Sequence, residues 1–227
     1  MKTVVITCRT VEEELTEALR RTGSDAEVIW LESGLHNVKR QLHDRMQEEL
    51  DRIEADRVLL AMGTCGNAYQ GVKTGKYETI LPRVDDCITL LLGSVSRRIQ
   101  ISRELAAYFF SEGWLKGERN LWVEYQHMVE KYGEEEAEVI AGMMYGHYRT
   151  LGILDCGFSD PQSMLERTKV IADTLHLEQK LIPASVDLLC RLLSGPWDDA
   201  ERFLVIPPES EITGEMLLLP GGGAGLQ

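Results

Sequence analysis

Short apolar runs alternate with amphipathic stretches along the first half of this chain, and this alternation restricts the fold more than any other feature. The runs at residues 3–7, 26–31, 58–61 and 76–81 are typical of buried strands. Residues 11–21 and a longer stretch from Leu35 to Ile53 have the three- and four-residue apolar spacing of helices. The order strand, helix, strand predicts an α/β protein whose parallel-sheet, Rossmann-like layers carry helices on both faces.

The remainder of the chain predicts a helical segment followed by a second, shorter α/β half. Residues 97–111, 120–132 and 134–148 read as helices, whereas 88–92 fits either a helical turn or a strand. Strands at 151–155, 180–182 and 203–206 then alternate with helices at 163–175 and 186–193. We therefore divide the chain into an N-terminal half that carries the cysteine site (1–96), a helical segment (97–149), a C-terminal half of similar plan (150–207) and a tail (208–227).

Charge and hydropathy exclude several classes of function. The 227 residues carry a formal net charge of -13, which disfavours a nucleic-acid binder, because such a protein needs a basic face. The same charge disfavours docking on anionic lipid. No segment has the length and apolar character of a membrane span or a signal peptide, so we expect no membrane association and a cytoplasmic location.

Three of the five cysteines are candidate metal ligands. Cys8 and Cys65 each follow a predicted strand, and the loop from Pro82 to Asp86 could bring Cys87 to the same edge of the sheet. Three thiolates can hold zinc or an iron–sulfur cluster, and His36 could supply a fourth ligand. The plain alternative for Cys87 is a small buried side chain in a helix. The odd number of cysteines and their wide spacing do not read as a disulfide framework.

Residues around Cys65 and Cys87 could bind or act on a small anionic molecule. Gly63 and Gly66 flank Cys65 and allow close backbone approach to a cofactor. Arg83 carries a planar guanidinium that suits a carboxylate or phosphate group. Asp85 and Asp86 could transfer protons or orient a ligand, or they could simply form an ion pair with Arg83 within the loop.

The same loop also allows an alternative to metal binding, which is nucleophilic catalysis. Cys65 could be a nucleophile in a thiol-dependent hydrolase or transferase, with backbone amides of Gly66 and Asn67 stabilising an oxyanion and His36 acting as the base.

The chain resembles a family of bacterial and archaeal proteins that carry a conserved domain of unknown function. The resemblance extends from Cys8 to the strand near Ile206, and Met62 stands where the family commonly has tyrosine. The matching pieces are Leu35-His36, Gly63-Thr64-Cys65-Gly66, Pro82-Arg83, Asp86-Cys87, Gly113-Trp114 and His147-Tyr148. The family resemblance implies no established activity. It does imply anaerobic organisms with corrinoid-dependent methyltransferase genes nearby, so a corrinoid protein or methyltransferase is the expected partner, for an enzyme or for a non-catalytic accessory protein.

Overall fold

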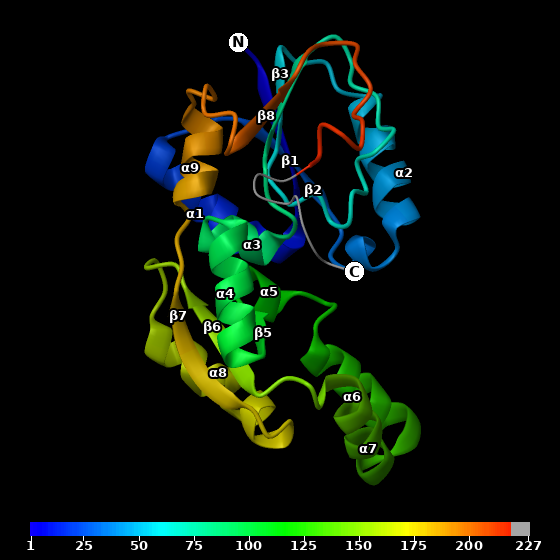
Figure 1. Cartoon of the computed structure of the whole chain (residues 1–227), viewed down its shortest axis with the longest axis vertical. Coiled ribbons are helices and arrows are strands. Elements are labelled where there is room, and N and C mark those ends of the chain that lie inside the picture. Colours follow the sequence, from blue (N-terminus) through cyan, green and yellow to red (C-terminus); the bar gives the residue numbers. More distant parts are fainter. Residues whose placement is uncertain (219–227) are drawn as a thin grey trace.

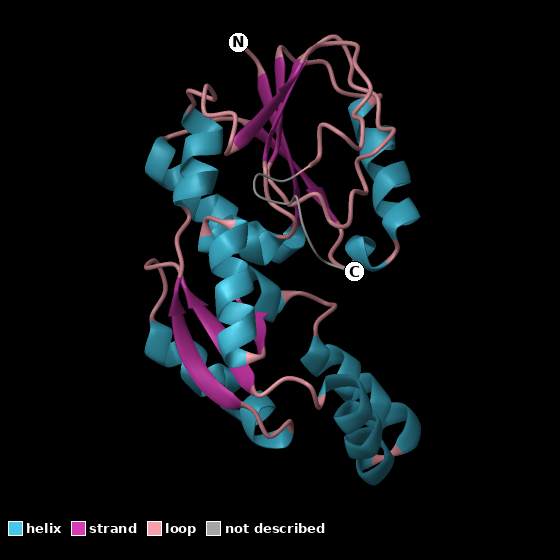
Figure 2. Ribbon diagram, in the orientation of Figure 1, coloured by secondary structure: helices cyan, strands magenta, loops and turns pink. Residues whose placement is uncertain are grey.

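The computed structural model describes residues 1–218 and contains two β-sheets connected by helices (Figure 1). The predicted α/β class with parallel, Rossmann-like layers is confirmed. In Figure 2 the two sheets lie one above the other, and a helical hairpin projects beside the lower one. Among residues 1–218, no helix has the length and apolar character needed to span a bilayer.

The first sheet has five strands in the order β2-β1-β3-β4-β8. Four of them are parallel, and β8 pairs antiparallel with β4 at one edge. The strands are β1 (Thr3–Cys8), β2 (Glu27–Leu31), β3 (Arg57–Leu60), β4 (Glu78–Pro82) and β8 (Phe203–Ile206).

Alternate side chains of these strands enter two different cores. Val5 and Leu59 pack with helices α1 (Glu12–Thr22) and α9 (Asp187–Ser194), whereas Ile6 and Leu60 pack with α2 (Lys39–Leu50). Helices therefore cover both faces of the sheet, which explains why its strands are apolar at nearly every position. The 3-10 turns η1 (Arg9–Val11) and η2 (Leu35–Asn37) lead into α1 and α2.

The second sheet is inserted between β4 and β8 of the first. The chain leaves β4 through α3 (Cys87–Leu92) and α4 (Val95–Leu105), and it returns through α9. The inserted strands are parallel, in the order β5-β6-β7. The elements of this part are β5 (Ala107–Phe110), α5 (Glu112–Lys116), α6 (Leu121–Tyr132), α7 (Glu134–Tyr145), β6 (Thr150–Asp155), α8 (Pro161–Thr174) and β7 (Glu178–Pro183).

Two parts of the chain differ from the sequence-based expectation, and one run that was ambiguous in the sequence is resolved. The predicted helix 97–111 is wrong beyond Leu105, because Ala106 ends α4 in the left-handed region and residues 107–110 form β5. The ambiguous run 88–92 is helical, within α3. The strand at 203–206, which we assigned to the C-terminal half, pairs with β4 in the first sheet.

The expected tail from residue 208 is also corrected as far as residue 218. Ile212 is fully buried and Leu217 nearly so. The backbone of Ile212 exchanges hydrogen bonds of 2.8 Å with Gly71 and Val72. This segment therefore covers the loop after Cys65, and residues 219–227 lie outside the described part of the chain.

The carboxyl ends of β1 and β5 meet where the two sheets join. The turn η1 after β1 contacts α5 after β5. A Cβ atom on Gly113 would lie 2.7 Å from both the Thr10 carbonyl oxygen and Glu14 Oε2, so only glycine fits there. Glu14 is fully buried at this contact: its Oε1 accepts a hydrogen bond from Gly113 N at 3.2 Å, and its Oε2 has no partner among the described residues.

Glu14 makes the stability of this junction dependent on pH. Burial raises the pKa of the Glu14 carboxyl, so its protonation stabilises the fold fully below the unfolded-state pKa. That stabilisation is lost as the pH rises through the folded-state pKa. We predict that Glu14→Gln, which cannot ionise, raises the free energy of unfolding at pH 7 by on the order of 1 kcal/mol. The gain should shrink toward pH 4 in urea titrations, and a gain that does not change with pH would contradict this account.

Candidate functional site

The loop after β3 and the loop after β4 lie against each other at the carboxyl edge of the first sheet. Thr64 N donates to the Val84 carbonyl at 3.0 Å, and Cys65 N donates to the Asp85 carbonyl at 2.8 Å. A Cβ atom on Gly63 would lie 2.5 Å from Asp86 Cα. Gly63 is therefore required by the neighbouring backbone, which is a structural reason for the glycine that we had predicted to contact a cofactor.

The Cys65 turn has an unusual backbone conformation. Cys65, Gly66 and Asn67 have φ values of 45°, 68° and 62°. A residue with a Cβ atom pays roughly 1–2 kcal/mol to occupy this left-handed region. Such strain concentrates at functional sites, where it fixes the position of a side chain. Gly66, the second glycine of the prediction, has open space at its Cβ position.

This arrangement brings the Cys65 and Cys87 side chains together near the end of β1. Cys87 is buried at the first position of α3 and interacts with the Cys65 side chain, which is partly exposed. Thr10 Oγ1, just after β1, donates to Cys87 Sγ at 3.8 Å. Cys8 is buried at the end of β1 and donates from its Sγ to the Glu32 carbonyl at 3.7 Å.

The thiols of Cys8 and Cys87 are stabilised in the protonated form. Burial, followed by the charge of Cys87, raises the pKa of Cys8 to about 11. The interaction with Cys65, followed by burial, raises the pKa of Cys87 well above its ordinary value. A bound cation would reverse this preference, because a coordinated thiol loses its proton.

Tyr69 is a member of this site that the sequence did not indicate. Its ring is fully buried, and its hydroxyl has no hydrogen-bond partner among the described residues. Burial raises its pKa most, and the charges of Cys65, Cys87 and Cys8 each raise it further. Tyr69 and the three cysteines belong to the same core cluster. The loop that holds Tyr69 packs in one core cluster with α2 and with the segment around Ile212.

The described conformation does not hold a ready-made metal site. Within residues 1–218, no three side chains of His, Cys, Asp or Glu lie as a metal-ligand group.

His36, the predicted fourth ligand, lies on η2 beside Trp114 of α5, with 5.6 Å between ring centroids. Burial lowers the pKa of His36, and the negative charge of Asp86 opposes that shift. The imidazole is thus favoured in its neutral form, which can bind a metal or accept a proton.

The two aspartates have different surroundings. Asp86 caps α3, since its Oδ1 accepts a hydrogen bond from Thr89 N at 2.6 Å, and its Oδ2 lies 3.7 Å from Arg98 Nε. Asp85 has a buried Oδ1 without a hydrogen-bond partner among the described residues. The cap gives Asp86 a structural role, and the catalytic roles of both residues stay predictions.

The Arg83 side chain is held by the segment that follows Ile212. Its Nη1 donates to the carbonyls of Met216 and Leu218 at 2.9 and 3.0 Å. It also lines a pocket of about 270 Å³ with Ser94 and Ser96 at the start of α4 and with Arg202. Arginines and a helix N-terminus suit an anion, although Glu201 also lines this pocket and Arg202 Nε pairs with Asp199 at 3.2 Å. No ion pair joins Arg83 to Asp85 or Asp86 among the described residues.

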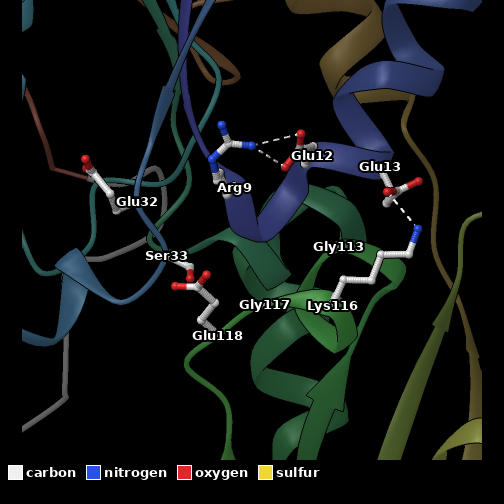
Figure 3. A pocket seen from close by; sticks show the side chains of 9 residues that line it. All are labelled: Arg9, Glu12, Glu13, Glu32, Ser33, Gly113, Lys116, Gly117 and Glu118. Atoms are coloured by element: carbon white, nitrogen blue, oxygen red, sulfur yellow. Dashed lines mark hydrogen bonds and ion pairs between the residues drawn. The ribbon is translucent and has the colours of Figure 1, made fainter. Parts of the chain in front are cut away.

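A larger pocket of about 400 Å³ opens between residues 9–13 and α5 (Figure 3). Arg9 Nη1 pairs with Glu12 at 2.8 Å, and Lys116 Nζ pairs with Glu13 at 2.8 Å, across the junction of the two sheets. Glu32 and Glu118 also line the pocket, so carboxylates outnumber cations. An anionic ligand therefore fits the Arg83 pocket better than this one.

Cys156 and Cys190 belong to a different core cluster from Cys8, Cys65 and Cys87. Cys156 follows β6 and is buried near Glu14, and burial followed by the charge of Glu14 raises its pKa to about 12. Cys190 is partly buried in α9.

The close contact between Gly63 and Asp86 allows us to predict how a substitution at Gly63 changes stability. Gly63→Ala should lower the free energy of unfolding by about 1–3 kcal/mol, because the two loops must separate to admit the methyl group. Gly142→Ala is the matched control: it lies in α7 with open space at its Cβ position, and it should raise stability by about 0.5–1 kcal/mol. Both values come from urea denaturation, and equal effects would contradict the close contact.

Comparison with known proteins shows the family but no characterised relative. No curated protein and no solved structure matches the chain. The family described as "Protein of unknown function (DUF1638)" matches residues 30–193. This range is shorter at both ends than the resemblance seen in the sequence, so it includes Cys65 and Cys87 but not Cys8. Because the match covers well over half of the sequence, the chain belongs to the DUF1638 family.

Proposed function

We propose that this protein is a cytoplasmic metal- or iron–sulfur-binding protein whose ligands are Cys8, Cys65 and Cys87, with His36 as a fourth. One observation carries the proposal: the paired loops after β3 and β4 set Cys65 against Cys87, and Cys87 contacts Thr10, two residues after Cys8. Thiolates select zinc and iron–sulfur clusters over hard cations.

Metal binding requires the Cys65 turn to move, because no ligand group is complete in the described conformation. The turn is suited to such a movement. Gly66 has open space around it, and the left-handed conformation of Cys65 and Asn67 stores strain that a change in backbone conformation would release.

A small anionic substrate is the second part of the proposal. The Arg83 pocket, with two arginines and the N-terminus of α4, supports it. This pocket and the cysteines lie at opposite ends of α3, so α3 is the element through which a bound anion would influence the thiol site.

The family resemblance supports a place in anaerobic one-carbon metabolism, with a corrinoid protein or methyltransferase as partner. Two alternatives to a metal-binding protein predict different experimental results. An accessory protein without chemistry would fold and bind its partner without metal, whereas a thiol hydrolase or transferase would depend on Cys65 alone.

Anaerobic purification followed by metal and sulfide analysis tests the thiol site. We predict that Cys65→Ser lowers the metal content by most of its value while circular dichroism shows a preserved fold. The reason is that a serine hydroxyl is a poor ligand for a soft metal, and Cys65 lies in a turn and not in a helix or strand. Sulfide in the wild-type protein would identify an iron–sulfur cluster, and its absence with zinc present would identify a zinc site.

Cys156→Ser is the matched control, since Cys156 is also a thiol at the end of a strand but lies beside Glu14. It should keep the metal. Equal loss from both variants would place the site elsewhere. A folded wild-type protein that neither contains metal nor takes up zinc or a reconstituted cluster would end the proposal and favour the accessory role.

Arg83→Lys tests the anion pocket separately. A lysine ammonium cannot reproduce the planar fork of arginine. We therefore predict weaker binding of inorganic phosphate in calorimetric titrations, with metal content unchanged. Arg40→Lys, on the exposed face of α2, should leave phosphate binding as in the wild type, and a similar loss from both variants would exclude this pocket.

A further inference from the structure

The hairpin of α6 and α7 projects from the second sheet with an apolar surface that the described part of the chain leaves uncovered (Figure 1). Its own core is small, with Tyr125, Ala137 and Ala141 buried between the two helices. On the opposite side of α7, Met143 is 81% exposed and Val139 is 59% exposed. Between Ala137 and Tyr145 the only charged residue is Glu138.

The exposed residues form one continuous stripe. Val139, Gly142, Met143 and Gly146 follow the spacing i, i+3, i+4 and i+7, which places them on one face of a helix. Gly142 has nothing within 4 Å of its Cβ position, so a second helix could approach its backbone closely. A helix that is apolar on opposite sides normally has both sides covered.

The charges along the hairpin identify what fits this stripe. The first turn of α7 carries Glu134, Glu135 and Glu136, whereas exposed His147 and Arg149 follow its end. None of these five residues forms an ion pair within residues 1–218. The residues that precede the stripe in the sequence are therefore acidic, and the residues that follow it are basic.

We propose that this face binds a second copy of the same chain, with the two α7 helices antiparallel and crossing at Gly142. Two-fold symmetry then places the acidic first turn of each α7 beside the basic segment that follows α7 in the other copy. The apolar stripes of the two copies cover each other, so the four helices lie side by side in the order α6, α7, α7, α6. A contact of one helix pair is small compared with stable interfaces, so the dimer should dissociate on dilution.

Sedimentation equilibrium and light scattering of the full chain over a range of concentrations test this pairing. We expect a reversible monomer–dimer equilibrium that Met143→Glu shifts to monomer. Val170→Glu is the matched control, because Val170 is 52% exposed on α8, away from the stripe, and it should leave the equilibrium unchanged. A protein that stays monomeric at all concentrations, or a dimer that Met143→Glu does not weaken, would overturn the proposal.

Two further variants test the orientation of the helices. Gly142→Cys should form a covalent dimer under mild oxidation, well above the level of the wild type and of Val170→Cys. Glu135→Arg should weaken the dimer at low salt, and adding Arg149→Glu to the same chain should restore it. A parallel pairing of the two stripes could form the cross-link but would not show the rescue, and an unrelated interface would show neither.

Discussion

The contact between the backbones of Gly63 and Asp86 is the constraint on which the rest of the structure depends. It joins the loop after β3 to the loop after β4 at a separation that no side chain allows. The same contact sets Cys65 against Cys87 and fixes the start of α3. Because α3 and α4 lead into the inserted sheet, the place of that sheet also follows from this point. One glycine thus links the arrangement of the thiols with the arrangement of the two sheets.

Local patterns in the sequence were sufficient for much of the first sheet. The apolar runs at β1, β2, β3 and β4 predicted strands in nearly their observed places, because strands buried on both faces are apolar throughout. The cysteines after β1 and β3 were expected at one edge for the same reason, since parallel strands end together.

The parts that sequence reasoning missed depend on contacts between distant residues. Tyr108, Phe109 and Phe110 fit a helix by their spacing, yet they form β5 because β6 is available to pair with them. The strand β8 pairs with β4 across more than a hundred intervening residues. Tyr69 shares its core cluster with Ile212, which is more than a hundred residues away in the sequence. The position of Arg83 was missed similarly, because its partners Met216 and Leu218 lie in a stretch without periodicity.

The insertion of the second sheet has a consequence for folding order. During synthesis β4 emerges early, but its outer neighbour β8 appears only after the whole inserted unit has been made. Until then β4 is an open edge strand, which can pair with other chains. Pairing between strands so far apart in sequence also closes slowly. The return of α9 and β8 to the first sheet can therefore occur only after the inserted unit has been synthesised, and the segment around Ile212, which shares a core cluster with Tyr69, follows still later in the chain.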